Sequence, residues 1–225
     1  MIIEVTLGTI QYLELSLWIV SIFFLTFAGI WFSREYKRTK NILFFWVGPF
    51  FFLFIIARIF RLLVRFYIGE PKPGEPLIGD AFILESIYTI VSYIGLFCIY
   101  FALEKTYIRK TKFFFSILVW IITILSIIDF ITRNLLWITL PLFILTVLAL
   151  PIIFFILAAK SSGQVRKNSI IVAIGIIFFI LGIAFDIPEG RILFIGLGEL
   201  FLATIPPIFQ IIACILIWEG FRKRV

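Results

Sequence analysis

Seven long apolar segments alternate with short polar segments along the chain. They cover residues 10–32, 41–68, 81–103, 113–132, 135–159, 169–185 and 192–218. An α-helix of about 20 apolar residues crosses the hydrocarbon core of a bilayer, and it satisfies its own backbone hydrogen bonds there. The pattern therefore predicts an all-α bundle of seven transmembrane helices, folded as one domain over residues 1–225.

Charges in the polar segments alternate in sign. Clusters of Lys and Arg follow the first, third, fifth and seventh spans, whereas the intervening loops carry Glu70, Glu75, Asp80, Asp186 and Glu189. Lys and Arg are enriched in cytoplasmic loops. We therefore expect a multi-pass protein of the cell membrane with its N-terminus outside and its C-terminus in the cytoplasm.

Composition agrees with a chain that lies mostly in lipid. Hydrophobic residues make up 63% and charged residues 15% of the 225 residues, whereas a soluble domain is about half apolar. The formal charge of +7 would suggest nucleic acid in a soluble protein. Here the basic residues flank apolar spans, so we interpret them as topology signals and contacts to anionic lipid, with no nucleic-acid partner. The richness in Ile and Phe indicates an archaeal-like, prokaryotic source.

Few residues of the types that catalysis and metal binding require are present. The chain has no His, and both Cys98 and Cys214 fall inside apolar segments. The commonest metal ligand and general base is therefore missing, and two thiols alone form no structural zinc site. We expect no enzymatic activity, no metal and no cofactor.

A row of three arginines in the second span is the strongest local signal. Arg58, Arg61 and Arg65 are three and four residues apart, which places them on one helix face. Charges at membrane depth are costly and seldom face lipid, so these side chains need partners. The candidate acids lie in the outer halves of other spans: Glu14, Glu85, Asp129 and Glu199. We expect a hydrogen bond from Arg58 to at least one of them, with Glu85 as the first choice.

Two interpretations of these charges remain open. The first is a structural ion-pair network that holds the bundle together. The second is an outward-facing polar chamber whose guanidinium groups bind a small anionic or zwitterionic ligand. Its lining would be Arg58, Arg61, Glu85 and Glu199.

The seventh span adds a buried amide to the candidate site. Gln210 follows Pro206 and Pro207 on the same helix. The two prolines remove two backbone donors, so we expect a kink there. Such a kinked helix suits a ligand site and is equally common in inert membrane bundles, where neighbours repair the lost hydrogen bonds.

An internal repeat is a further hypothesis. A Lys-Asn pair opens both the second and the sixth span, and in that register Gly48 aligns with Gly175. A parallel three-plus-one-plus-three arrangement of spans would follow. Chance matching in a chain rich in Phe and Ile is the alternative.

The layout of seven spans, the Trp- and Arg-bearing second span and the basic loop 33–40 resemble two groups of proteins. These are the seven-span sensor regions of prokaryotic histidine kinases and stand-alone archaeal seven-span proteins. Retinal-binding rhodopsins are a poorer match, because the last span has no Lys for the Schiff base.

The resemblance implies a sensor- or receptor-like role. No kinase domain follows the spans in this sequence, so signalling is expected to require a partner membrane or signalling protein. Two other functions stay open. One is a transporter of small solutes or lipids that uses the repeat, and the other is an accessory subunit of a membrane complex.

Overall fold

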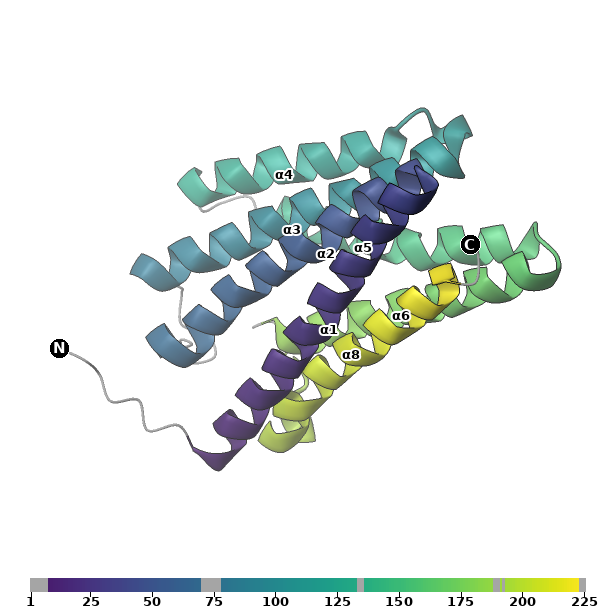
Figure 1. Ribbon diagram of the computed structural model, residues 1–225. Coiled ribbons are helices and arrows are strands. Elements are labelled where there is room, and N and C mark those ends of the chain that lie inside the picture. The colour runs from purple at the N-terminus through teal and green to yellow at the C-terminus, as the bar shows by residue number, and fades with distance from the viewer. Residues whose placement is uncertain (1–7, 70–77, 133–135, 188–190, 192, 223–225) are drawn as a thin grey trace. The chain divides into compact units, whose positions relative to one another are not determined.

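All regular elements that the structure describes are helices (Figure 1). The structure is a computed structural model, and it describes residues 8–69, 78–132, 136–187, 191 and 193–222. The elements are α1 Thr9–Thr39, α2 Ile42–Leu63, the π-helix η1 Val64–Gly69, α3 Gly79–Thr106, the 3-10 helix η2 Arg109–Thr111, α4 Phe114–Thr132, α5 Leu136–Ala159, α6 Gly163–Asp186, the 3-10 helix η3 Ile195–Leu197 and α8 Glu199–Arg222.

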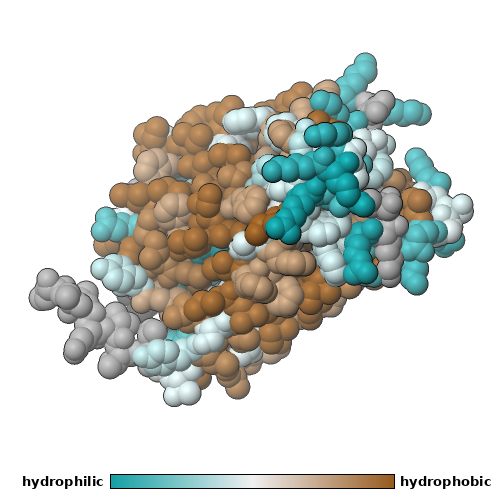
Figure 2. All heavy atoms as spheres, viewed as in Figure 1, coloured by the Kyte–Doolittle hydropathy of each residue, from teal (hydrophilic) through white to brown (hydrophobic). Residues whose placement is uncertain are grey.

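Seven helices in the described part of the chain are long and apolar enough to cross a membrane. The helix α2 continues into η1, and together they form one candidate span of 28 residues, Ile42–Gly69. Many large apolar side chains on these helices are exposed, and Figure 2 shows them over much of the visible face. Apolar surface of this extent marks a membrane-facing protein. The all-α class and the seven candidate spans of an integral membrane protein are confirmed.

Two span boundaries differ from those expected. The helix α8 starts at Glu199 instead of residue 192, because Gly198 adopts a positive φ of 87° that interrupts the helix. The helix α6 starts at Gly163, six residues before the predicted apolar segment. Apolar patterning marks the part of a helix that lies in hydrocarbon, whereas helices also extend into the polar interface.

The described chain divides into two compact units. Unit 1 contains residues 1–24 and 147–225, and unit 2 contains residues 25–146, so the boundaries fall inside α1 and α5. In unit 1, α6 packs along α8. In unit 2, α3 packs against both α2 and α4. The single domain expected from the sequence stays a prediction.

A short turn joins α1 to α2 in unit 2. Lys40 takes the left-handed conformation, with φ 54°, directly after α1. Asn41 is the N-cap of α2, and its side chain accepts a hydrogen bond from the backbone N–H of Leu43 at 3.0 Å. This cap satisfies one of the free donors at the start of α2.

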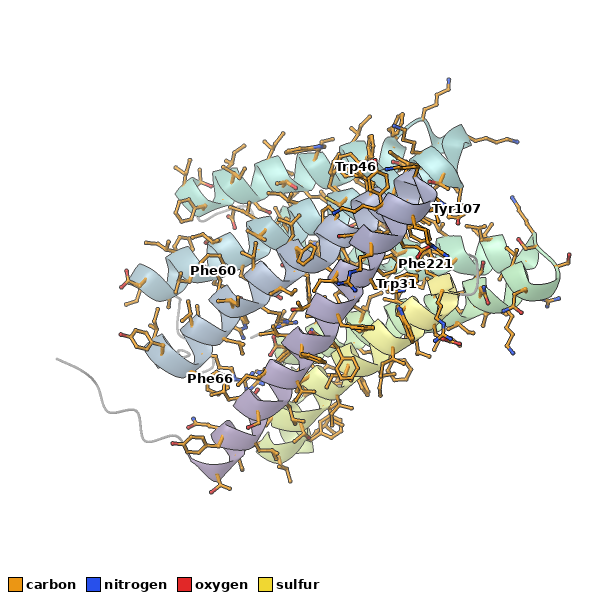
Figure 3. The ribbon with its side chains drawn as sticks, viewed as in Figure 1. Trp31, Trp46, Phe60, Phe66, Tyr107 and Phe221 are labelled. Atoms are coloured by element: carbon orange, nitrogen blue, oxygen red, sulfur yellow. The ribbon has the colours of Figure 1, made fainter. Side chains whose placement is uncertain are left out.

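Aromatic rings and one glycine join α1 to α2. The rings of Phe32 and Phe51 stack with their centroids 5.4 Å apart. A Cβ atom added at Gly48 would lie 2.8 Å from Oγ of Ser33, so the absence of a side chain lets the helices approach closely. Trp46 lies near the start of α2, far along the helix from Phe66 in η1 (Figure 3).

Glycines also set the close packing of α6 on α8 in unit 1. A Cβ atom at Gly175 would lie 3.0 Å from side-chain atoms of Ile217, and one at Gly220 would lie 3.0 Å from the backbone oxygen of Asn168. Small residues are a common means of bringing membrane helices together.

Gly48 and Gly175, which align in the proposed repeat, lie against different helices. Gly48 lies against α1, whereas Gly175 lies against α8, and these two neighbours do not correspond in the proposed register. Each glycine accommodates a different helix, so the aligned residues do not serve the same contact. The three-plus-one-plus-three repeat itself stays a prediction.

Candidate functional site

The residues predicted for the site divide between the two units. Unit 2 contains Arg58, Arg61, Arg65, Glu85 and Asp129, and unit 1 contains Glu14, Glu199 and Gln210. Each unit has its own cluster of buried polar groups.

In unit 2 the structure pairs Arg61 of α2 with Glu85 of α3. Nη1 of Arg61 donates to Oε2 of Glu85 at 3.0 Å. The Arg61 side chain is 1% exposed and the Glu85 side chain is 14% exposed. A charge-assisted hydrogen bond of this kind is stronger than a neutral one. The pair therefore links two helices, and Glu85 is its more exposed member.

Arg58 lies one helical turn before Arg61 and is completely buried. Its guanidinium carbon lies 5.2 Å from the ring centroid of Phe54 on α2 and 5.8 Å from that of Tyr88 on α3. A guanidinium within about 6 Å of an aromatic ring face gains a cation–π attraction. The hydrogen bond predicted from Arg58 to an acid stays a prediction.

The arginine row ends where α2 changes its helical geometry. The π-helix η1 begins at Val64, three residues after Arg61, and it contains Arg65, whose guanidinium carbon lies 5.6 Å from the ring of Phe66. Phe60 and Phe66 lie toward this end of the helix (Figure 3). π-helical segments are rare and occur frequently at functional sites.

The other acids predicted for the site have separate environments. Asp129 is half-buried on α4. Glu199 is the first residue of α8 and is exposed, and among the described residues of unit 1 it forms no ion pair. A carboxylate in the first turn of a helix is stabilised by the helix dipole, which is the role that this position gives Glu199.

A charged cluster around Arg191 in unit 1 was not predicted. Nη2 of Arg191 donates to Oε1 of Glu14 at 3.0 Å and lies 3.9 Å from Oδ1 of Asp186. Both acids are buried, and Glu14 also accepts from Nε1 of Trp18 at 3.4 Å. The sequence signal for this cluster is Arg191, the one basic residue in the otherwise acidic segment 186–191. Charge alternation alone marks that segment only as a loop.

Arg191 also donates a hydrogen bond to a backbone oxygen that lacks its helical donor because of a proline. Its Nη2 donates to the backbone oxygen of Leu202 at 3.0 Å. In an α-helix this oxygen would accept from the N–H of residue 206, but Pro206 has no N–H to donate. Arg191 therefore supplies the hydrogen bond that the proline removes, and α8 continues through Pro206 and Pro207 to Arg222.

Gln210 is fully buried further along α8. Its Oε1 accepts from Oγ of Ser21 on α1 at 3.5 Å. A Cβ atom at Gly182 of α6 would lie 3.0 Å from Cγ of Gln210, so the amide packs tightly between helices of unit 1. This environment is that of a packed polar contact between helices.

Glu104, at the other end of α3 from Glu85, is a buried acid with a structural role. Its carboxylate accepts from the backbone N–H groups of Phe115 at 2.9 Å and Ser116 at 3.0 Å, and from Oγ1 of Thr111 at 2.8 Å. The Ser116 hydroxyl donates to the same carboxylate. Glu104 therefore caps the start of α4 from a neighbouring helix, as an acid near a helix N-terminus does.

Comparison with known proteins adds no relative. No protein family, no curated protein and no solved structure matches this chain. No group of three Cys, Asp or Glu side chains among the described residues is placed to hold a metal ion. The protein is an integral membrane protein with seven candidate spans, and each of its two units contains an arginine–carboxylate ion pair with one buried member.

The contact between Arg191 and Leu202 predicts a specific coupling with Pro206. Arg191→Ala should lower the free energy of unfolding in detergent by about 3 kcal/mol, because it removes the guanidinium group that pairs with the buried carboxylate of Glu14. The loss should be about 1 kcal/mol smaller in a Pro206→Ala background, where the new N–H satisfies the Leu202 oxygen. Thermal and denaturant unfolding of the four variants measures this difference.

The matched control is Pro207→Ala. Its new N–H would donate to the backbone oxygen of Ala203. The described hydrogen bond of Arg191 goes to the oxygen of Leu202 instead. The loss caused by Arg191→Ala should be unchanged in this background. An equal loss in the wild-type, Pro206→Ala and Pro207→Ala backgrounds would refute the assigned role.

Proposed function

We propose that the chain is a non-enzymatic, sensor- or receptor-like protein of the cell membrane that binds a small anionic or zwitterionic ligand. The ligand binds at the arginine end of α2, formed by Arg58, Arg61, Arg65 and Glu85. One observation carries the proposal, namely two buried guanidinium groups directly before an α-to-π transition. Buried charge is costly, and here it coincides with irregular helix geometry of the kind found at functional sites.

The Arg61–Glu85 pair suggests how a ligand binds. Glu85 is the partly exposed member, so an incoming carboxylate or phosphate group competes with it for the guanidinium fork of Arg61. A zwitterionic ligand provides both charges, since its anionic group binds Arg61 and its cationic group binds the displaced Glu85. Exchange of this pair changes the link between α2 and α3, and a partner protein transmits the change.

The contacts of the described residues do not favour the other two functions. A transporter built on the repeat would use equivalent helix contacts, and the two aligned glycines contact different helices. An accessory subunit would present a face of small residues to a neighbour. The described glycines inside the helices instead contact other helices of their own units, at Gly29, Gly48, Gly95, Gly175, Gly182 and Gly220.

The orientation with the N-terminus outside belongs to the same proposal. Gly163 begins α6, and Gly196 follows it beyond the helix, so the two positions flank one span and both are exposed. Cysteine introduced at Gly196 should react with a membrane-impermeant maleimide in intact cells, whereas cysteine at Gly163 should react only after permeabilisation. The reverse pattern would contradict the orientation.

Ligand binding is tested with three charged probes, namely glycine betaine, succinate and inorganic phosphate, with glycerol as the neutral control. A ligand at about 100 times its Kd stabilises the folded state by about 2.7 kcal/mol. We therefore expect at least one charged probe to raise the melting temperature of the detergent-solubilised protein by about 5 °C. Arg58→Lys and Arg61→Lys should remove this rise, because lysine keeps the charge and lacks the fork.

The matched control is Arg222→Lys, at an exposed arginine in the last turn of α8. It should keep the full rise in melting temperature. The proposal fails if no charged probe exceeds glycerol on the wild-type protein, or if the rise persists in both Arg58→Lys and Arg61→Lys.

A further inference from the structure

We propose that the end of unit 2 opposite the arginine row is a binding surface for the headgroups of anionic phospholipids. Two segments form it, namely the turn after α1 and the loop between α3 and α4. Six exposed basic residues define this lysine surface: Lys37, Arg38, Lys40, Lys105, Lys110 and Lys112. The proposal does not depend on the function proposed for the arginine end.

Aromatic contacts hold the two segments together. Phe101 of α3 lies 4.8 Å from Trp46 of α2 and 5.4 Å from Phe113, between ring centroids. Phe45, next to Trp46, lies 5.0 Å from Tyr36 of α1. The row of five rings therefore joins the turn after α1 to the loop after α3, and Trp46 and Tyr107 lie at this same end of the unit (Figure 3).

The ammonium groups of two lysines lie close to rings of this row. Nζ of Lys40 lies 5.9 Å from the centroid of the Tyr36 ring, and Nζ of Lys105 lies 5.6 Å from that of Phe101. Aromatic rings with basic residues beside them are typical of the level of the lipid headgroups.

Both acids at this end are turned away from solvent. Glu35 is buried and accepts from Nε of Arg38 at 2.8 Å. Glu104 is buried and caps α4. The charge that this surface presents is therefore positive, which complements the phosphate of an anionic lipid.

Two lysines of this surface have a backbone conformation that suits glycine. Lys40, Lys112 and Phe113 are the non-glycine residues with positive φ in the described chain, with φ of 54°, 48° and 64°. Glycine adopts this conformation more easily, and Gly163 of unit 1 does so, with φ 58°, at the turn before α6. Glycine at positions 40 and 112 therefore removes two charges without straining the backbone.

A phospholipid fits this surface better than a soluble anion. Phe113 and Phe114 are 41% and 59% exposed beside Lys112. A phospholipid offers phosphate to the lysines and acyl chains to these rings, so it matches both parts of the surface.

The test measures binding of phosphatidylglycerol and phosphatidylcholine to the detergent-solubilised protein by native mass spectrometry. The variant Lys40→Gly/Lys112→Gly removes two charges and suits the positive φ at both positions, so it should be at least as thermally stable as the wild type. Each basic residue near an anionic lipid surface contributes about 1 kcal/mol, which is about fivefold in affinity. The variant should therefore bind phosphatidylglycerol about 25-fold more weakly and phosphatidylcholine unchanged.

The matched control is Lys160→Gln/Lys167→Gln, which removes two exposed lysines from unit 1. It should keep affinity for phosphatidylglycerol within about twofold of the wild type, less than the change expected for one charge. The proposal is overturned if the Lys40→Gly/Lys112→Gly variant keeps wild-type affinity for phosphatidylglycerol. It is also overturned if the control loses as much affinity as that variant.

Discussion

Arginine buried inside apolar helices is the constraint on which the rest of this structure depends. A guanidinium group cannot lose its proton in a protein, so an Arg that leaves water must find acceptors or aromatic faces. Unit 2 meets this need for Arg61 with Glu85 and for Arg58 with the rings of Phe54 and Tyr88. The pairing of α2 with α3 follows, because these partners come from both helices.

In unit 1 the buried member of the pair is the acid, and Arg191, whose side chain is 19% exposed, satisfies two different needs. It neutralises Glu14, and it replaces the hydrogen bond that Pro206 removes from the Leu202 oxygen. A single side chain thus satisfies the backbone oxygen that Pro206 leaves without its helical donor. A buried polar group stabilises the fold while its hydrogen-bond partners are in place, and it destabilises the fold when they are removed.

The sequence predicted the helices well because apolar length and charge clusters depend on local composition. It predicted that Arg61 needs a partner, and Glu85 was among the candidates because it lies on the next span. It could not predict that Arg191 pairs with Glu14, since these residues are 177 positions apart and only the fold of unit 1 brings them together. The π-helix after Arg61 and the cap that Glu104 gives α4 also depend on packing, for which the sequence pattern carries no signal.

A double-mutant cycle on Arg61 and Glu85 tests most directly whether buried arginine governs this fold. Arg61 is 1% exposed and keeps its charge, whereas Glu85 is 14% exposed and retains some access to solvent. Glu85→Met should therefore cost more unfolding free energy than Arg61→Met, with a loss of about 3–5 kcal/mol. The double variant should regain part of that loss, because both members of the ion pair are then removed together. Equal losses for the two single variants, or a double variant as unstable as their sum, would contradict the central role of the buried arginine.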